Sequence, residues 1–294
     1  MPIVKYSILM LYIALVWASA ILFVKTEEAT VPPITIMAGR ALLAFLTIFV
    51  IALITRKKIL EVISYAPKFL FLSLIGIVLV WTGLAFGQEF LSVGLASVLV
   101  TVTPLFTFVV LVFFLRMEPF SLEGLGGLLM GVVGLVLVIG LHNIVSGGTT
   151  LIGVFYIGGS FVLLAINGIL IMRWLRSIDP IITTLYLIFF GAVILTALAF
   201  IFESHVQVPW TKETIASELA LAVICTASGY FGYFYLIKTA GAYFASFIFY
   251  FLPIFGLLEG RIFRGEAVSI TQIAGVVIVI LGIYIINRQK FKDG

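Results

Sequence analysis

Charged residues are scarce in this sequence, because Asp, Glu, Lys and Arg fill only 10% of its 294 positions. Soluble globular domains use about a quarter of their residues for charge, so this composition excludes a water-exposed surface of ordinary size. Cysteine is scarcer still, and the single Cys225 excludes both an internal disulfide and a thiolate metal cluster. Because Cys225 falls within an apolar stretch, we expect a buried thiol.

Histidine is nearly absent, which bears on enzyme activity. The only two, His142 and His205, fall in connections between apolar stretches. The stretch Thr226-Ala-Ser228-Gly229 resembles the surroundings of an intramembrane protease serine, but no histidine lies at that depth to activate it. A Gly-x-x-x-x-Gly-Lys phosphate loop and metal-ligand spacings within a helix are also missing. We therefore expect no enzyme activity, no catalytic residues, no metal and no cofactor.

Long apolar stretches are abundant instead. Hydrophobic residues make up 63% of the chain, and runs of about 20 residues, the length that spans a bilayer, follow one another almost without pause. Each run is continuously apolar, without the alternation typical of outer-membrane β-strands, so we predict an all-α integral membrane protein with ten transmembrane helices. The predicted spans are residues 6–24, 33–54, 69–86, 92–115, 122–141, 150–172, 181–202, 215–236, 241–263 and 268–287.

The basic residues predict the orientation. With the N-terminus in the cytoplasm, cytoplasmic segments hold twelve Lys and Arg residues and the opposite side holds four, with Arg40 left inside a span. We therefore expect a multi-pass protein of the cell (inner) membrane with both termini cytoplasmic. This topology explains the net charge of +4, so the expected partner is the lipid bilayer and not a nucleic acid. Ala18-Ser19-Ala20 matches a signal-peptide cleavage site, but the apolar run continues through Val24, so we expect the first span to be retained.

The two halves of the chain share an ordered set of residues, as is typical of transporters built from repeats. Each half has a proline-led span, an Ala-Ser pair followed by proline, a Glu-x-x-Ser turn and two glycines. In the first half these are Pro33, Ala96-Ser97, Pro104, Glu118, Ser121, Gly127 and Gly134. In the second half they are Pro180, Ala245-Ser246, Pro253, Glu266, Ser269, Gly275 and Gly282. Chance recurrence of small residues is the alternative, but order and spacing both agree.

Five spans per half is an odd number, so the second half must enter the membrane from the side opposite to the first. We predict two inverted five-helix repeats, residues 1–145 and 146–294, around a central cavity. Two halves that face opposite ways can exchange conformations, which is the physical basis of alternating access.

These residues resemble the drug/metabolite transporter superfamily in its ten-helix EamA-type branch. The resemblance covers nearly the whole chain and includes Trp17-Ala-Ser, Ala38-Gly39-Arg40 and Leu236-Ile-Lys-Thr-Ala-Gly-Ala. It implies two inverted five-helix repeats around a central cavity and, in many relatives, export of amino acids or similar small metabolites. The family pattern usually has an Asn in the first span, where Ala20 stands here, and Asn167 occupies the equivalent place in the second half.

Arg40 is the most informative position, because a guanidinium inside a span is costly unless it faces a partner or water. Glu259 enters the ninth predicted span from the same outer side. We predict that Arg40 and Glu259 either pair or line an outer vestibule, where protonation of Glu259 would couple transport to a proton gradient. Alternatively, Arg40 binds backbone carbonyls, and Glu259 pairs with Arg261 or Arg264 at the interface.

Pro104 and Pro253 are the predicted gating residues. Each ring removes a backbone hydrogen bond in mid-span and bends the helix, at matched places in the two halves. A bend that only lets neighbouring helices pack is the alternative.

We expect the substrate-binding cavity to be lined by aromatic and polar side chains from both halves. The predicted substrate-binding residues are Trp17, Trp81, Gln88, Thr101, Asn167, Tyr230, Phe247 and Tyr250. For each aromatic residue taken alone, packing against lipid or a neighbouring helix is the alternative.

The whole pattern predicts a secondary transporter that exports a small-molecule substrate, an amino acid or related metabolite, by alternating access. A translocase for a lipid or lipid-linked sugar and a non-transporting membrane scaffold are the alternatives. A lateral opening between helices would favour the translocase, and a cavity filled by side chains would favour the scaffold. Gly126-Gly127, Gly131 and Gly134 permit close helix packing within the chain or between copies, which is compatible with a homodimer.

Overall fold

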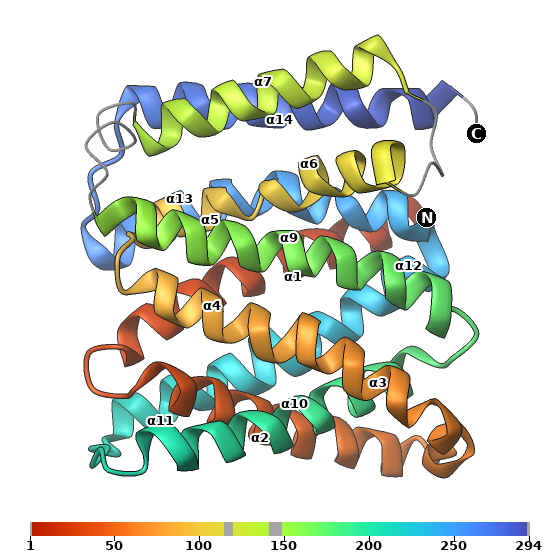
Figure 1. The fold of residues 1–294 in the computed structure, drawn as a ribbon, viewed down its shortest axis with the longest axis vertical. Coiled ribbons are helices and arrows are strands. Elements are labelled where there is room, and N and C mark those ends of the chain that lie inside the picture. The colour runs from red at the N-terminus through yellow and green to blue at the C-terminus, as the bar shows by residue number, and fades with distance from the viewer. Residues whose placement is uncertain (1, 115–119, 141–148, 293–294) are drawn as a thin grey trace.

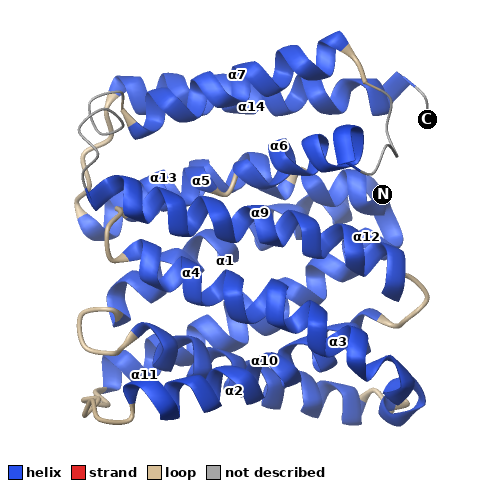
Figure 2. Cartoon of the chain, viewed as in Figure 1, coloured by secondary structure: helices blue, strands red, loops and turns tan. Residues whose placement is uncertain are grey.

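The computed structural model describes residues 2–114, 120–140 and 149–292, and every regular element within these ranges is a helix (Figures 1 and 2). Eight stretches there are long and apolar enough to cross a membrane, and α13 and α14 supply the other two predicted spans. Glu118, His142 and the predicted boundary between residues 145 and 146 lie outside the described residues.

The helices follow the ten predicted spans. In the first half they are α1 (Pro2–Glu27), α2 (Pro33–Ile54), the 3₁₀ helix η1 (Ile59–Tyr65), α3 (Ala66–Ser73), the π-helix η2 (Leu74–Val78), α4 (Leu79–Gln88), α5 (Val93–Leu99), α6 (Val102–Val109), the π-helix η3 (Val110–Phe114) and α7 (Leu122–Ile139). In the second half they are α9 (Thr149–Leu175), α10 (Pro180–Glu203), α11 (Lys212–Leu219), the π-helix η4 (Ala220–Ser228), α12 (Gly229–Ser246), α13 (Ile248–Arg264) and α14 (Ile270–Lys292).

Two boundaries differ most from the predicted ones. Helical structure of the third span begins at Ile59, ten residues earlier than expected, because η1 and α3 continue one another. The connection predicted at residues 237–240 lies inside α12, and the turn comes at Phe247. No proline interrupts α12, so the helical backbone can continue through the polar stretch.

Proline and polar caps set several helix starts. α2 begins with Pro33 and α10 with Pro180, where the missing N–H costs no helical hydrogen bond, which confirms the two proline-led spans. The Asp179 carboxylate accepts a hydrogen bond from the N–H of Ile181 at 2.9 Å and caps α10. The Ser92 hydroxyl does the same for α5 through the N–H of Leu95.

The packing of the helices has twofold character. Three pairs are formed by counterparts from the two halves, α2 with α10, α5 with α13, and α7 with α14. The other main contacts occur in equivalent pairs. The contact of α4 with α9 is equivalent to that of α12 with α1, and the contact of α1 with α13 is equivalent to that of α9 with α6. The pairs α7–α14 and α2–α10 lie at opposite ends of the long axis, and α1 begins at the same side of the bundle on which α14 ends (Figure 1). The fold is therefore the predicted arrangement of two inverted five-helix repeats.

Glycines bring α7 and α14 into backbone contact. A Cβ added at Gly134 would lie 2.6 Å from the carbonyl oxygen of Gly275, and one added at Gly282 would lie 2.5 Å from that of Gly127. Gly126, in contrast, has no heavy atom within 4 Å of such a Cβ. Most of the glycines in the predicted small-residue series therefore allow helices of the same chain to pack closely.

Glu266 ties the second half to the first. Its two carboxylate oxygens accept hydrogen bonds from the N–H groups of Val93 and Gly94, at 2.7 and 2.9 Å, at the start of α5. A carboxylate at a helix N-terminus also interacts favourably with the helix dipole. The Glu-x-x-Ser turn of the second half therefore holds a helix of the first half in place.

We expect Glu266→Ala to lower the free energy of unfolding by about 2 kcal/mol, because two charge-assisted hydrogen bonds are lost. Unfolding of the purified protein in detergent, followed by intrinsic fluorescence, measures the change. Glu123→Ala is the matched control, since Glu123 is an exposed acidic residue in the first turn of α7. Equal stability of the two variants would show that the Glu266 contact contributes nothing.

Candidate functional site

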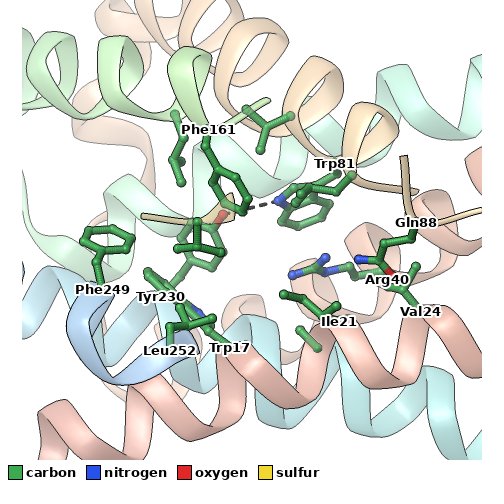
Figure 3. Close-up of a pocket in the computed structure, with 15 residues that line it drawn as sticks. Trp17, Ile21, Val24, Arg40, Trp81, Gln88, Phe161, Tyr230, Phe249 and Leu252 are labelled. Atoms are coloured by element: carbon green, nitrogen blue, oxygen red, sulfur yellow. Dashed lines mark hydrogen bonds between the residues drawn. The ribbon is translucent and has the colours of Figure 1, made fainter. Parts of the chain in front are cut away.

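A cavity lies where α1, α2 and α4 of the first half meet α9, α12 and α13 of the second (Figure 3). About 610 Å³ of space inside it is free of atoms, a volume that includes the open solvent at its mouth. Most of its wall is apolar. Arg40, Gln88 and Tyr230 supply its main polar groups.

Arg40 lies in α2 at the edge of this cavity and is only 6% exposed. Its Nε donates a hydrogen bond to Thr226 Oγ1 at 2.7 Å, and its guanidinium carbon lies 4.1 Å from the centroid of the Trp81 ring. A desolvated cation over an indole ring gains about 2 kcal/mol. The remaining weak contact is from Nη1 to the sulfur of Met37 at 3.9 Å. The guanidinium therefore retains donors for a carboxylate.

Two π-helical segments flank the cavity at matched places. When the two halves are aligned so that Trp81 matches Tyr230, the residues of η2 match residues inside η4. In η4 the hydroxyl of Thr226 donates to the carbonyl of Leu221 at 2.7 Å, five residues earlier, while it accepts from Arg40. π-helical geometry within a longer helix is often found at functional sites.

Aromatic rings from both halves form one wall. The Trp17 ring lies 5.5 Å from Tyr230 and 6.4 Å from Phe249, and Trp81 lies 6.1 Å from Tyr230, centroid to centroid. The indole N–H of Trp81 donates to the Tyr230 hydroxyl at 3.3 Å, and Figure 3 shows this bond beside Phe161. The wall suits an apolar or aromatic group.

Two buried polar atoms in the cavity lining lack a hydrogen-bond partner among the described residues. They are the indole nitrogen of Trp17 and Oε1 of Gln88, whose residue is 2% exposed. Buried polar groups are almost always paired, so Oε1 of Gln88 can serve a bound ligand. The Trp17 nitrogen lies against Gly229 of α12, where an added Cβ would be 2.5 Å from it. The backbone carbonyl of Gln88 accepts a hydrogen bond from the ammonium of Lys25, which fixes the end of α4.

Five of the predicted site residues line this one cavity. They are Trp17, Arg40, Trp81, Gln88 and Tyr230. Their helices, α1, α2, α4 and α12, come from both halves, as the repeat argument required.

Four other predicted substrate residues lie elsewhere. Thr101 is fully buried at the interruption between α5 and α6, where its hydroxyl donates to the carbonyl of Val98. Asn167 packs against the backbone of Gly76, between α9 and the third span. Phe247 and Tyr250 line an apolar groove formed by α13 and α14, on the face of α13 away from the cavity.

Among the described residues, Arg40 and Glu259 form no ion pair with each other, and Glu259 forms none with Arg261 or Arg264. The ion pairs found there involve other groups. Glu259 accepts a hydrogen bond from the Ser19 hydroxyl at 2.6 Å, and its Oε2 has no partner. The predicted direct pair and its interfacial alternative are therefore both absent, and Arg40 binds a side chain instead of backbone carbonyls.

The two prolines lie beside interruptions in their helices. The break at Val100 and Thr101 precedes Pro104, whose ring cannot donate to the carbonyl of Val100. In the second half the turn at Phe247 precedes Pro253, which lies inside α13. Each break adjoins a cavity residue, Val100 in one half and Phe249 in the other. Their role as gates stays a prediction.

Sequence reasoning missed Thr226, Phe161 and a pair of buried acids, Glu27 and Glu218. The acids are 2% and 4% exposed. Glu218 lies inside a predicted span, so the same cost of intramembrane charge that singled out Arg40 was a signal for it. Nothing in the sequence pointed to Thr226, because π-helical geometry determines which way it faces.

Residues 4–140 and 151–288 each match the EamA-like transporter family. The chain is similar to an uncharacterized transporter, YoaV, of Bacillus subtilis, with 25% identity over 96% of both chains. It is 26% identical to an uncharacterized transporter of Archaeoglobus fulgidus, over 93% of this chain and 95% of that one. It is also 27% identical to a WAT1-related chloroplastic protein of Arabidopsis thaliana, over 94% of this chain and 68% of that protein.

A solved crystal structure superposes with a TM-score of 0.73 and covers 97% of this chain and 98% of the other. At 14% identity, this likeness shows the fold alone.

Proposed function

Because the chain belongs to the EamA-like transporter family, we propose that it exports amino acids or related small metabolites by alternating access, with the cavity at Arg40 as the substrate site. The observation that carries the proposal is a buried guanidinium with unused donors at the edge of an aromatic cavity. Arginine has five N–H donors in a planar fork that matches a carboxylate.

The cavity lining favours a particular chemistry of substrate. One cation supports a single carboxylate, and the rings of Trp17, Trp81 and Tyr230 support an apolar or aromatic side chain. The unpaired Oε1 of Gln88 can accept from an ammonium group. An amino acid with a large apolar side chain has all three features.

The relation between the halves supports alternating access. Each main helix contact either joins equivalent helices of the two halves or has an equivalent contact elsewhere in the bundle. The two halves can therefore exchange conformations, which reverses the side from which the cavity opens. The interruptions at Val100 and Phe247 give both halves a place to bend.

Uptake into proteoliposomes tests the substrate. We expect L-phenylalanine, L-leucine or another apolar amino acid to be transported, and L-phenylalaninamide, which lacks the carboxylate, to be transported at least about tenfold more slowly, because its contact with Arg40 is lost. Vesicles without protein give the background. Equal rates for the acid and the amide would contradict a carboxylate site at Arg40.

One feature favours a second candidate, a translocase for a lipid or lipid-linked sugar. The groove of Phe247, Tyr250, Phe251 and Ile254 with Ile280, Leu281 and Tyr284 is apolar and lies between helices α13 and α14, where an acyl chain fits. Transport of labelled phospholipid in the same vesicles, with no amino acid transported, would favour this function.

A further inference from the structure

Two acidic side chains are buried beside Arg40. Glu27 is the last residue of α1 and Glu218 lies in α11, and the two are 2% and 4% exposed. The Ser217 hydroxyl faces the carboxyl group of Glu27 but donates to the carbonyl of Phe23 at 3.5 Å, and none of the four carboxyl oxygens has a well-formed hydrogen bond to another described residue. Unpaired carboxylates in such a site are costly, so these groups require a ligand.

The two carboxyl groups are within hydrogen-bonding reach of each other. Ionised carboxylates only accept hydrogen bonds, so a bond between them requires one proton. Glu218 lies so close to the backbone of Gly39 that a Cβ there would overlap its carboxyl group. The absence of a side chain at Gly39, next to Arg40, therefore leaves space for the carboxyl group of Glu218.

The charges around the pair favour a proton over a metal cation. The positive charge of Arg40 on α2 attracts both carboxyl groups, although the guanidinium forms no direct ion pair with either of them. On α1, Lys25 pairs with Glu28 at 3.1 Å. From the adjoining elements, the Cys225 thiol and the Tyr230 hydroxyl face Arg40. Two carboxylates, one shared proton and one guanidinium sum to zero charge, which is the least costly state in a buried site.

We infer that Glu27 and Glu218 form a proton-binding site that shares one proton at neutral pH, and that a substrate carboxylate on Arg40 brings in a second. The second step rests on the proposed function. An amino acid zwitterion brings no net charge, but its carboxylate neutralises the Arg40 guanidinium that balanced the acid pair. The carboxylate of the pair that is still ionised then binds one proton from water. No other bond forms or breaks, and substrate and proton then cross the membrane together.

Infrared spectra of the full-length protein in lipid nanodiscs test the shared proton. The Glu28→Gln background removes a neighbouring acid at the end of α1, whose pKa burial raises to about 7. We expect a protonated carboxyl band at neutral pH that disappears in Glu27→Gln and in Glu218→Gln. An amide can donate the hydrogen bond that the proton provides, so both variants should fold. The band should persist in Glu61→Gln, which changes an exposed acid paired with Lys58.

A band that survives both pair substitutions would overturn the site. The second step is tested by adding L-phenylalanine in weakly buffered solution, where about one proton should be taken up per bound molecule and none in Glu27→Gln/Glu218→Gln. Binding without proton uptake would overturn the coupling. Absence of L-phenylalanine binding would count against the proposed function, while the infrared result would still decide the proton site.

Discussion

Arg40→Lys is expected to reduce L-phenylalanine uptake by about 100-fold, although the positive charge is kept. Lysine cannot donate to Thr226 as the Nε of Arg40 does, and it lacks the planar group that stacks on Trp81. It also offers a substrate carboxylate a single ammonium in place of a fork, and charge-assisted hydrogen bonds are each worth about 1.5 to 3 kcal/mol. Initial uptake rates in proteoliposomes measure the loss.

Arg173→Lys is the control for the same chemical change, because Arg173 lies exposed near the end of α9. Thr226→Val separates positioning from binding. It leaves the guanidinium but removes its hydrogen-bond partner, so we expect a smaller loss, about tenfold. Near-normal uptake by Arg40→Lys would show that Arg40 only fills space between α2 and η4.

Gly134→Ala is expected to lower the free energy of unfolding by about 3 kcal/mol, at the upper end of ordinary overpacking. The new methyl group would lie 2.6 Å from the carbonyl oxygen of Gly275 and 2.8 Å from the backbone nitrogen of Val279, and neither backbone atom can move aside alone. α7 and α14 must therefore separate along the contact. Thermal unfolding in detergent and the fraction of monodisperse protein report the change.

Gly126→Ala is the matched control in the same helix. Nothing lies within 4 Å of the added Cβ, and alanine favours a helix over glycine by about 1 kcal/mol, so this variant should be neutral or slightly more stable. The two substitutions are chemically identical and differ only in what surrounds them. If both destabilise equally, the close approach of α7 and α14 is not what holds them together.

Most of the architecture could be predicted from sequence, because a bilayer imposes its thickness on every span. Apolar length determined where the helices run, and Pro33 and Pro180 indicated where two of them begin. The matched order of small residues indicated the twofold relation that the helix contacts display. Arg40 was identifiable because charge inside a span is rare and needs a reason.

The facing of side chains around each helix was harder to predict. A helix that is apolar on all sides carries little information on which side faces a cavity, so Phe247 and Tyr250 were expected there but line the outer groove. Asn167 was expected to bind substrate, but it fills the space left by Gly76. The approach of Glu27 to Glu218 joins residues far apart in sequence, and no local pattern encodes it.

The proline-led spans also show where the halves stop being equivalent. Counted from Pro33 and Pro180, Arg40 of α2 corresponds to Leu187 of α10, which is 2% exposed. If the halves swap conformations as proposed, the swapped molecule is not a copy of the original, because a leucine cannot take over the contacts of a guanidinium. The inward-open and outward-open forms of the proposed cycle would therefore differ in free energy, and the protein without substrate would populate one of them more than the other.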